Sequence, residues 1–168
     1  NEEARVEPCL ESVKWCDEIV VVDDMSVDNT AHICRKYGAK VIAHPSGGDH
    51  DKQRNVGNDN STSDWILQMD ADERVSPELK KDIEKILAGS WQFSAYKLIR
   101  KNYFLGKFMA HGGWPEKQVR LFRKDQARYV GHSVHETLKV DGKIGKLKSH
   151  LEHYAFTSVS QYIARQLY

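Results

Sequence analysis

The chain has 168 residues, 40% of them hydrophobic and 29% charged, and its formal net charge is +1 at pH 7. This length suits one globular domain, and the composition excludes a disordered or membrane-spanning chain. The small net charge gives no reason to expect a nucleic-acid partner. Three cysteines without a CxxC pair exclude a disulfide framework and a structural zinc site. They favour a reducing compartment, so we expect a cytoplasmic protein.

The first ninety residues alternate between helical and strand patterns. Ser76 followed by Pro77 is a typical helix start, with a capping side chain and a proline in the first turn. The alternation predicts right-handed βαβ units and a parallel sheet. The predicted helices cover residues 6–15, 30–37, 51–58 and 77–88, and the predicted strands cover residues 18–22, 40–44 and 64–69.

The second half has a different pattern, in which strand-like alternation is interrupted by glycine-rich turns. This predicts a mixed or antiparallel extension of the sheet, followed by a final helix over residues 158–168. Because the chain opens on a helix, we expect the first strand of the fold to be missing and the chain to be truncated at both ends. The predicted strands of this half cover residues 93–104, 118–123, 129–130 and 134–140.

Pairs of acidic residues follow two of the predicted strands. Asp23-Asp24 follows the first strand, and Asp70-x-Asp72 follows the third. Open α/β sheets bind ligands beyond the carboxyl ends of their strands. In an extended backbone Asp70 and Asp72 point to the same side, where two carboxylates suit a hard divalent cation. The alternative that stays open is that these acids cap loops and the following helices.

Several short motifs occur along the chain in a recognisable order and spacing. They are Asn1-Glu2-Glu3, Val21 to Thr30, Gln53 to Gly57, Gln68 to Glu73, Gly113-Trp114-Pro115, Gln118 to Arg123, Gly131 to Glu136 and His153-Tyr154. In these motifs the chain resembles the family 2 glycosyltransferases over nearly its whole length. The later motifs resemble the branch that adds glucose or a related sugar to the lipopolysaccharide core. The resemblance implies a GT-A fold, a Rossmann-like mixed sheet flanked by helices, in one domain over residues 1–168.

The resemblance implies that residues 1–90 form the nucleotide-sugar-binding half. Asp23 would contact the uracil, and Arg54 would position the nucleotide or its phosphates. Asp24 and Met25 replace a small Ser-Gly pair that is common in the family, which leaves open which Asp meets the base. The residues implied for the nucleotide sugar are Glu2, Asp23, Asp24, Arg54 and Asp70, and those implied for a Mg²⁺ or Mn²⁺ ion are Asp70, Asp72 and His153.

The resemblance also implies that residues 91–168 form the acceptor-binding half, which takes a saccharide or glycolipid. Glu136 is the implied general base, because the acceptor hydroxyl loses its proton as it attacks. Trp114 stands in a glycine-rich loop, where its ring can stack on a sugar. The implied acceptor-binding residues are Trp114, Arg120 and His135.

With one base and no enzymic nucleophile, we expect a single displacement that inverts the anomeric carbon. The expected donor is a UDP-hexose, with glucose favoured. Two alternatives stay open, a metal-dependent nucleotidyltransferase and a non-catalytic nucleotide-sugar-binding domain. The first would be expected to show a glycine-rich, basic loop after its first strand, which residues 22–25 do not resemble. The second is disfavoured by the intact Asp70, Asp72 and Glu136. The basic stretch 97–128 leaves open a peripheral contact with the cytoplasmic face of the inner membrane.

Overall fold

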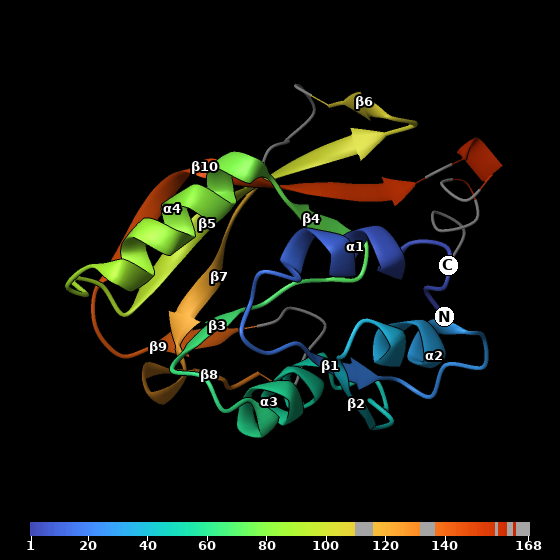
Figure 1. Ribbon diagram of the computed structural model, residues 1–168, viewed down its shortest axis with the longest axis horizontal. Helices are drawn as coiled ribbons and strands as arrows, with labels where there is room; N and C mark the ends of the chain where they lie inside the picture. Colours follow the sequence, from blue (N-terminus) through green and yellow to red (C-terminus); the bar gives the residue numbers. More distant parts are fainter. Residues whose placement is uncertain (110–115, 132–136, 157, 161–162, 164–168) are drawn as a thin grey trace.

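The structure, a computed structural model, describes residues 1–109, 116–131, 137–156, 158–160 and 163 (Figure 1). Its helices are α1 (Val6–Val13), α2 (Thr30–Lys36), α3 (His50–Asn60) and α4 (Pro77–Ala88), with a short 3₁₀ helix at Lys124–Gln126. Its strands are β1 (Val20–Asp23), β2 (Lys40–Ala43), β3 (Trp65–Leu67), β4 (Glu73–Val75), β5 (Ala95–Phe104), β6 (Lys107–Phe108), β7 (Glu116–Arg123), β8 (Ala127–Tyr129), β9 (Leu138–Val140) and β10 (Ile144–Phe156).

Most strands belong to one mixed sheet. Its order is β3-β7-β5-β10-β4, and β6 pairs with β5 in a hairpin. Strand β10 runs parallel to β5 and antiparallel to β4, whereas β7 runs antiparallel to both β3 and β5. Strands β1 and β2 form a parallel pair, and β8 and β9 form an antiparallel pair. The mixed α/β architecture expected from the sequence is confirmed.

The prediction of a parallel sheet over the first half is wrong for β3. This strand runs antiparallel to β7, with Ile66 opposite Phe122. Alternating helices and strands fix the local order of elements, but the partner of a strand depends on packing between distant residues. Here β7 takes the place beside β3 and brings Phe122, which is 0% exposed, into a buried cluster with Ala95 and Tyr129.

The sequence pattern does not predict β4 or β10, although β10 has 13 residues. A register shift between Lys146 and His150 interrupts the alternation of β10. Polar Ser149 is buried in β10 beside apolar Leu151, and Glu73 is buried in β4. The apolar period of two that marks a half-buried strand is therefore weak in both segments.

Helix α4 lies across one face of the large sheet (Figure 1) and supplies much of its core. Leu79 and Ile83 are 0% and 1% exposed. Burial of a side chain of this size contributes about 1.5–3 kcal/mol. The two residues pack in one cluster with Leu98 of β5, Leu121 of β7 and Leu151 of β10.

The start of α4 follows the predicted signal, and side-chain and glycine caps also bound α2. The Ser76 hydroxyl accepts a hydrogen bond from the Leu79 N–H at 3.2 Å at the start of α4. The Asp28 carboxylate accepts one from the Thr30 N–H at 3.0 Å at the start of α2, and Gly38 follows that helix with φ of 77°. Across the described residues, no helix has the length and apolar character needed to cross a bilayer.

Candidate active site

A pocket of 1310 Å³ is lined by β1, β3 and α3 together with residues beyond the ends of these strands. Helix α3 comes close to β1 at Gly57, where an added Cβ would lie 3.2 Å from Cγ2 of Val22. The tertiary structure gathers at this pocket the residues that the sequence predicts for the nucleotide sugar and the metal. Those that line it are Glu2, Asp23, Asp24, Arg54, Asp70, Asp72 and His153.

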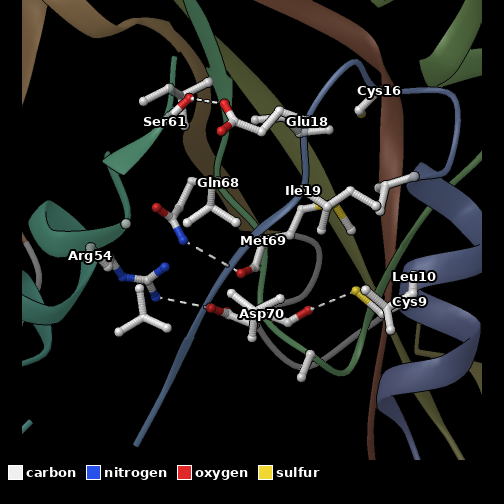
Figure 2. A pocket seen from close by; sticks show the side chains of 18 of the residues that line it. Cys9, Leu10, Cys16, Glu18, Ile19, Arg54, Ser61, Gln68, Met69 and Asp70 are labelled. Carbon is white, nitrogen blue, oxygen red and sulfur yellow. Dashed lines mark hydrogen bonds and ion pairs between the residues drawn. The ribbon is translucent and has the colours of Figure 1, made fainter. Parts of the chain in front are cut away.

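Asp70 is held between two arginines. Its Oδ1 accepts a hydrogen bond from Arg54 Nη2 at 3.0 Å (Figure 2), and its Oδ2 accepts one from Arg120 Nη2 at 2.9 Å. Burial alone would raise the pKa of Asp70, but the two guanidinium groups hold this pKa well below its usual range. A metal ion at Asp70 would have to share these oxygens with the arginines, and that role stays a prediction.

The backbone of Asp70 is fixed as well. The Cys9 thiol of α1 donates to the Asp70 carbonyl oxygen at 3.6 Å (Figure 2), and burial raises the pKa of this thiol to about 12. Cys9 therefore stays protonated and acts as a small buried residue.

A second buried carboxylate, which the sequence analysis does not identify as a site residue, supports Asp70. Glu73 is 0% exposed, and its Oε2 accepts a hydrogen bond from the Asp70 N–H at 2.9 Å. Its Oε1 accepts one from Arg120 Nη2 at 3.2 Å, and Arg100 Nη1 lies 3.9 Å from the same oxygen. A buried carboxylate needs such partners. No pattern in the sequence distinguishes Glu73 from the exposed acids of the chain.

Arg120 is placed differently from what its predicted role in acceptor binding requires. The residue is 4% exposed, and its guanidinium faces Asp70 and Glu73. Its Nε donates to Gln118 Oε1 at 3.0 Å. Because these contacts bury the charged group, the geometry gives Arg120 a role in positioning Asp70. A contact with an acceptor stays a prediction.

Asp72 has a different set of partners. Its Oδ2 lies 3.4 Å from Nε2 of His153 and 3.5 Å from Nη1 of Arg5, and the Nε of Arg5 lies 2.9 Å from Oε2 of Glu2. The side chains of Asp72 and His153 are 13% and 12% exposed. Burial alone would raise the pKa of Asp72, but His153 in its protonated form donates a hydrogen bond and a positive charge that more than offset burial, so this pKa is lowered.

Asp72 and His153 fit as two ligands of one divalent ion. Adjacent ligands of an octahedral ion with bonds of about 2.1 Å lie about 3 Å apart, and the two ligand atoms here are 3.4 Å apart. An imidazole nitrogen is a ligand for transition-metal ions more than for Mg²⁺, which favours Mn²⁺. No group of three or more His, Cys, Asp or Glu among the described residues is placed to hold an ion. Further ligands would come from water or a bound phosphate.

Asp23 and Asp24 have separate partners. Asp23 is 8% exposed, and its Oδ2 accepts a hydrogen bond from the Ser26 N–H at 3.1 Å. Asp24 is exposed and accepts hydrogen bonds from the N–H and the hydroxyl of Ser46 at 2.7 and 2.8 Å. Both acids stabilise loops, which is the alternative left open by the sequence. Both also line the pocket, and a contact with the uracil stays a prediction.

Comparison with known proteins identifies the family. The Glycosyl transferase family 2 domain matches residues 1–135, which is most of the chain. The chain belongs to glycosyl transferase family 2. It is 35% identical, over 97% of its length, to an uncharacterised glycosyltransferase of Rickettsia typhi. It is 29% identical, over 89% of its length, to the lipopolysaccharide core biosynthesis glycosyltransferase LpsC of Rhizobium meliloti. The chain spans 60% and 57% of the length of these two relatives.

Solved structures confirm the predicted GT-A fold of this family 2 chain. The crystal structure of S. aureus TarS 1–349 has a TM-score of 0.67 at 18% identity, over 92% of this chain and 58% of that chain. The same TarS segment in complex with UDP has a TM-score of 0.68 at 18% identity, over 98% of this chain and 60% of that chain. At this identity the likeness shows the fold.

Helix α3 of this family 2 chain connects the pocket to a second region. Asp51 Oδ2 accepts hydrogen bonds from the N–H of Gly131 at 2.7 Å and of Thr137 at 3.4 Å. One turn later, Asn55 Nδ2 donates to the carbonyl of Tyr129 at 2.9 Å. These contacts hold Gly131 and Thr137, the described residues on either side of 132–136. Three predicted site residues lie outside the described residues, namely Trp114, His135 and Glu136.

Proposed function

We propose that this chain binds a UDP-sugar together with a divalent ion and transfers the hexose, with glucose favoured, to a saccharide or glycolipid acceptor. The observation that carries the proposal is the pairing of Asp72 with His153 at a pocket that Arg54 and Asp23 also line. Family membership supports glycosyl transfer, and the likeness to LpsC supports an acceptor of the lipopolysaccharide-core type. A place at the cytoplasmic face of the inner membrane is part of the same proposal.

The pocket offers complementary groups for a nucleoside diphosphate. Asp72 and His153 would hold the ion, for which we favour Mn²⁺ over Mg²⁺. Arg54, oriented by Asp70, lies in the wall where a phosphate would bring negative charge. When bound, the ion supplies neutralisation of the charge that develops on the leaving diphosphate.

In the transfer step the acceptor hydroxyl oxygen bonds to the anomeric carbon as the bond from that carbon to the UDP oxygen breaks. The electron pair of the broken bond leaves with UDP, and the hydroxyl proton passes to the carboxylate of Glu136. A single displacement of this kind inverts the anomeric carbon. The family match gives no support to a nucleotidyltransferase, and a non-catalytic domain would bind the donor without turnover.

Calorimetric titration of UDP into the protein tests the donor site. We expect binding in Mn²⁺, no measurable binding in EDTA, and at least about a tenfold loss of affinity in Asp72→Ala with Mn²⁺. Asp125→Ala is the matched control, because the Asp125 side chain is 61% exposed in a surface ion pair. Binding that persists in EDTA, or that is unaffected in Asp72→Ala, would contradict the metal site.

The same preparation, assayed for UDP release from UDP-glucose with core oligosaccharides as acceptors, separates a transferase from a binding domain. Glu136→Gln should lower kcat by about 10²–10⁴-fold while UDP affinity is retained. Glu11→Gln is the control, because the Glu11 side chain is 46% exposed in a surface ion pair with Lys14. Equal turnover in wild type and Glu136→Gln would remove Glu136 as the base.

A further inference from the structure

His153 makes a second contact through the ring nitrogen that does not face Asp72. Its Nδ1 lies 2.5 Å from Oδ1 of Asn102. The two residues are paired across the parallel strands β10 and β5, and Asn102 is 3% exposed. This amide is therefore a buried polar group next to the candidate metal pair, and the function proposed above gives it no role.

The chemistry of the amide fixes which ring nitrogen carries the proton. An amide oxygen accepts hydrogen bonds and does not donate them, so a bond to Asn102 Oδ1 requires the proton on Nδ1 of His153. In the neutral ring, Nε2 then presents a lone pair. That lone pair faces the carboxylate oxygen of Asp72 at 3.4 Å. Two lone pairs turned toward one another attract a cation between them.

We propose that Asn102 is a positioning residue of the donor site, whose carbonyl oxygen fixes the tautomer and ring orientation of His153. Nε2 is thereby presented to the ion that Asp72 also binds. Histidines that bind metal ions commonly donate their second N–H to such an acceptor. Because His153 and Asn102 are 12% and 3% exposed, water is a poor substitute for the amide oxygen. This inference rests on the metal-dependent donor site proposed above.

Two substitutions of Asn102 separate its acceptor oxygen from its volume. Asn102→Leu keeps the approximate size and removes the acceptor, whereas Asn102→Asp keeps an acceptor oxygen at the same position. Leu98→Ala is the matched control, because Leu98 is 1% exposed in the apolar core of the same strand. It loosens β5 without touching His153. All four proteins are measured by ¹⁵N NMR of the imidazole in metal-free form at pH 8, and by Mn²⁺ titration in saturating UDP.

We expect Nδ1–H in wild type, Asn102→Asp and Leu98→Ala, and a shift toward Nε2–H in Asn102→Leu. In the titration, Asn102→Leu should lose about 10–100-fold in Mn²⁺ affinity. Asn102→Asp should bind Mn²⁺ at least as tightly as wild type. Leu98→Ala should lose thermal stability but keep the wild-type Mn²⁺ affinity.

Two results would overturn the positioning role while leaving the proposed function intact. One is equal Mn²⁺ affinity in wild type and Asn102→Leu, and the other is a proton on Nε2 of His153 in metal-free wild type. If the wild-type protein binds UDP without Mn²⁺, the proposed metal site fails, and the role of Asn102 fails with it. The two failures differ because only the second appears as UDP binding by the wild type in the absence of Mn²⁺.

Discussion

Asp70 and Asp72 stand two positions apart but meet different partners. The chain turns at residues 71–72, so the extended backbone that would place both carboxylates on one side does not continue through the motif. Asp70 faces Arg54 and Arg120, and Asp72 faces His153. The carboxylate less occupied by arginines, Asp72, is the better metal ligand, and Asp70 is better suited to orient the arginines.

At the residue scale, we expect Asp70→Asn to destabilise the fold because it removes a charged partner from the buried Arg120. Breaking a fully buried ion pair costs about 3–5 kcal/mol. Asp70 is 34% exposed, so solvent screening reduces the expected loss to about 1–3 kcal/mol at pH 7. Urea unfolding measures it. Asp125→Asn, in an exposed ion pair, is the control and should change stability by less than about 0.5 kcal/mol.

The pH dependence of this loss has a defined sign. The arginines lower the pKa of Asp70 in the folded protein, so the ionised carboxylate contributes its full stability above the unfolded pKa of about 3.9. That contribution disappears as the pH falls toward the folded pKa. The difference in stability between wild type and Asp70→Asn should therefore be constant above about pH 5 and shrink below about pH 4. A difference that grows on acidification would contradict the assignment.

Among the elements, α3 holds two parts of the molecule in fixed relation. Arg54 contacts Asp70 at the pocket. Asp51 contacts Gly131, and Asn55 contacts Tyr129, both shortly before residues 132–136. The three side chains come from little more than one turn of helix. Helix α3 therefore links the pocket to Tyr129, Gly131 and Thr137, which lie on either side of residues 132–136.

We expect Asp51→Ala to release the backbone at Gly131 and Thr137. Two backbone N–H groups would lose their acceptor, at a cost of about 1–3 kcal/mol for an unsatisfied buried group. Hydrogen exchange at Gly131 and Thr137 should accelerate, and kcat should fall, while UDP affinity stays within about twofold because Arg54 is untouched. Asp59→Ala is the control on the same helix, since the Asp59 side chain is 54% exposed in its pair with Arg128. Unchanged exchange at both amides would show that Asp51 does not hold the backbone there.

For the whole molecule, the donor pocket joins residues from distant parts of the chain. Asp23 ends β1, Asp72 precedes β4 and His153 lies in β10. The pocket also separates β1, which pairs with β2, from β3, which pairs with β7.

Because the pocket draws on both halves, we expect UDP with Mn²⁺ to stabilise the whole fold in one cooperative transition. A ligand at 100 times its Kd contributes about 2.7 kcal/mol. For a domain of this size that raises Tm by about 5–10 °C. Thermal unfolding by circular dichroism should show the shift in wild type and lose its Mn²⁺-dependent part in Asp72→Ala. A shift of similar size in EDTA would contradict a metal-dependent donor site.

The sequence by itself determined the elements whose signals are local. The strand β1 and the Ser76-Pro77 start of α4 were each predicted, because capping and short-range burial depend on neighbouring residues. The family motifs likewise named the seven candidate site residues that line the pocket. Tertiary structure alone decided what each of those residues contacts.

Long-range pairing is the physical reason for this difference. The pairing of β3 with β7 joins residues 54 to 58 positions apart in sequence, and the pairing of β10 with β5 joins residues 49 to 52 positions apart. Glu73 is 47 positions from its buried partner Arg120. A polar residue has the same letter whether it faces water or a buried partner. The contact between Asn102 and His153 is of this kind, since it arises from the register of two strands that no local pattern records.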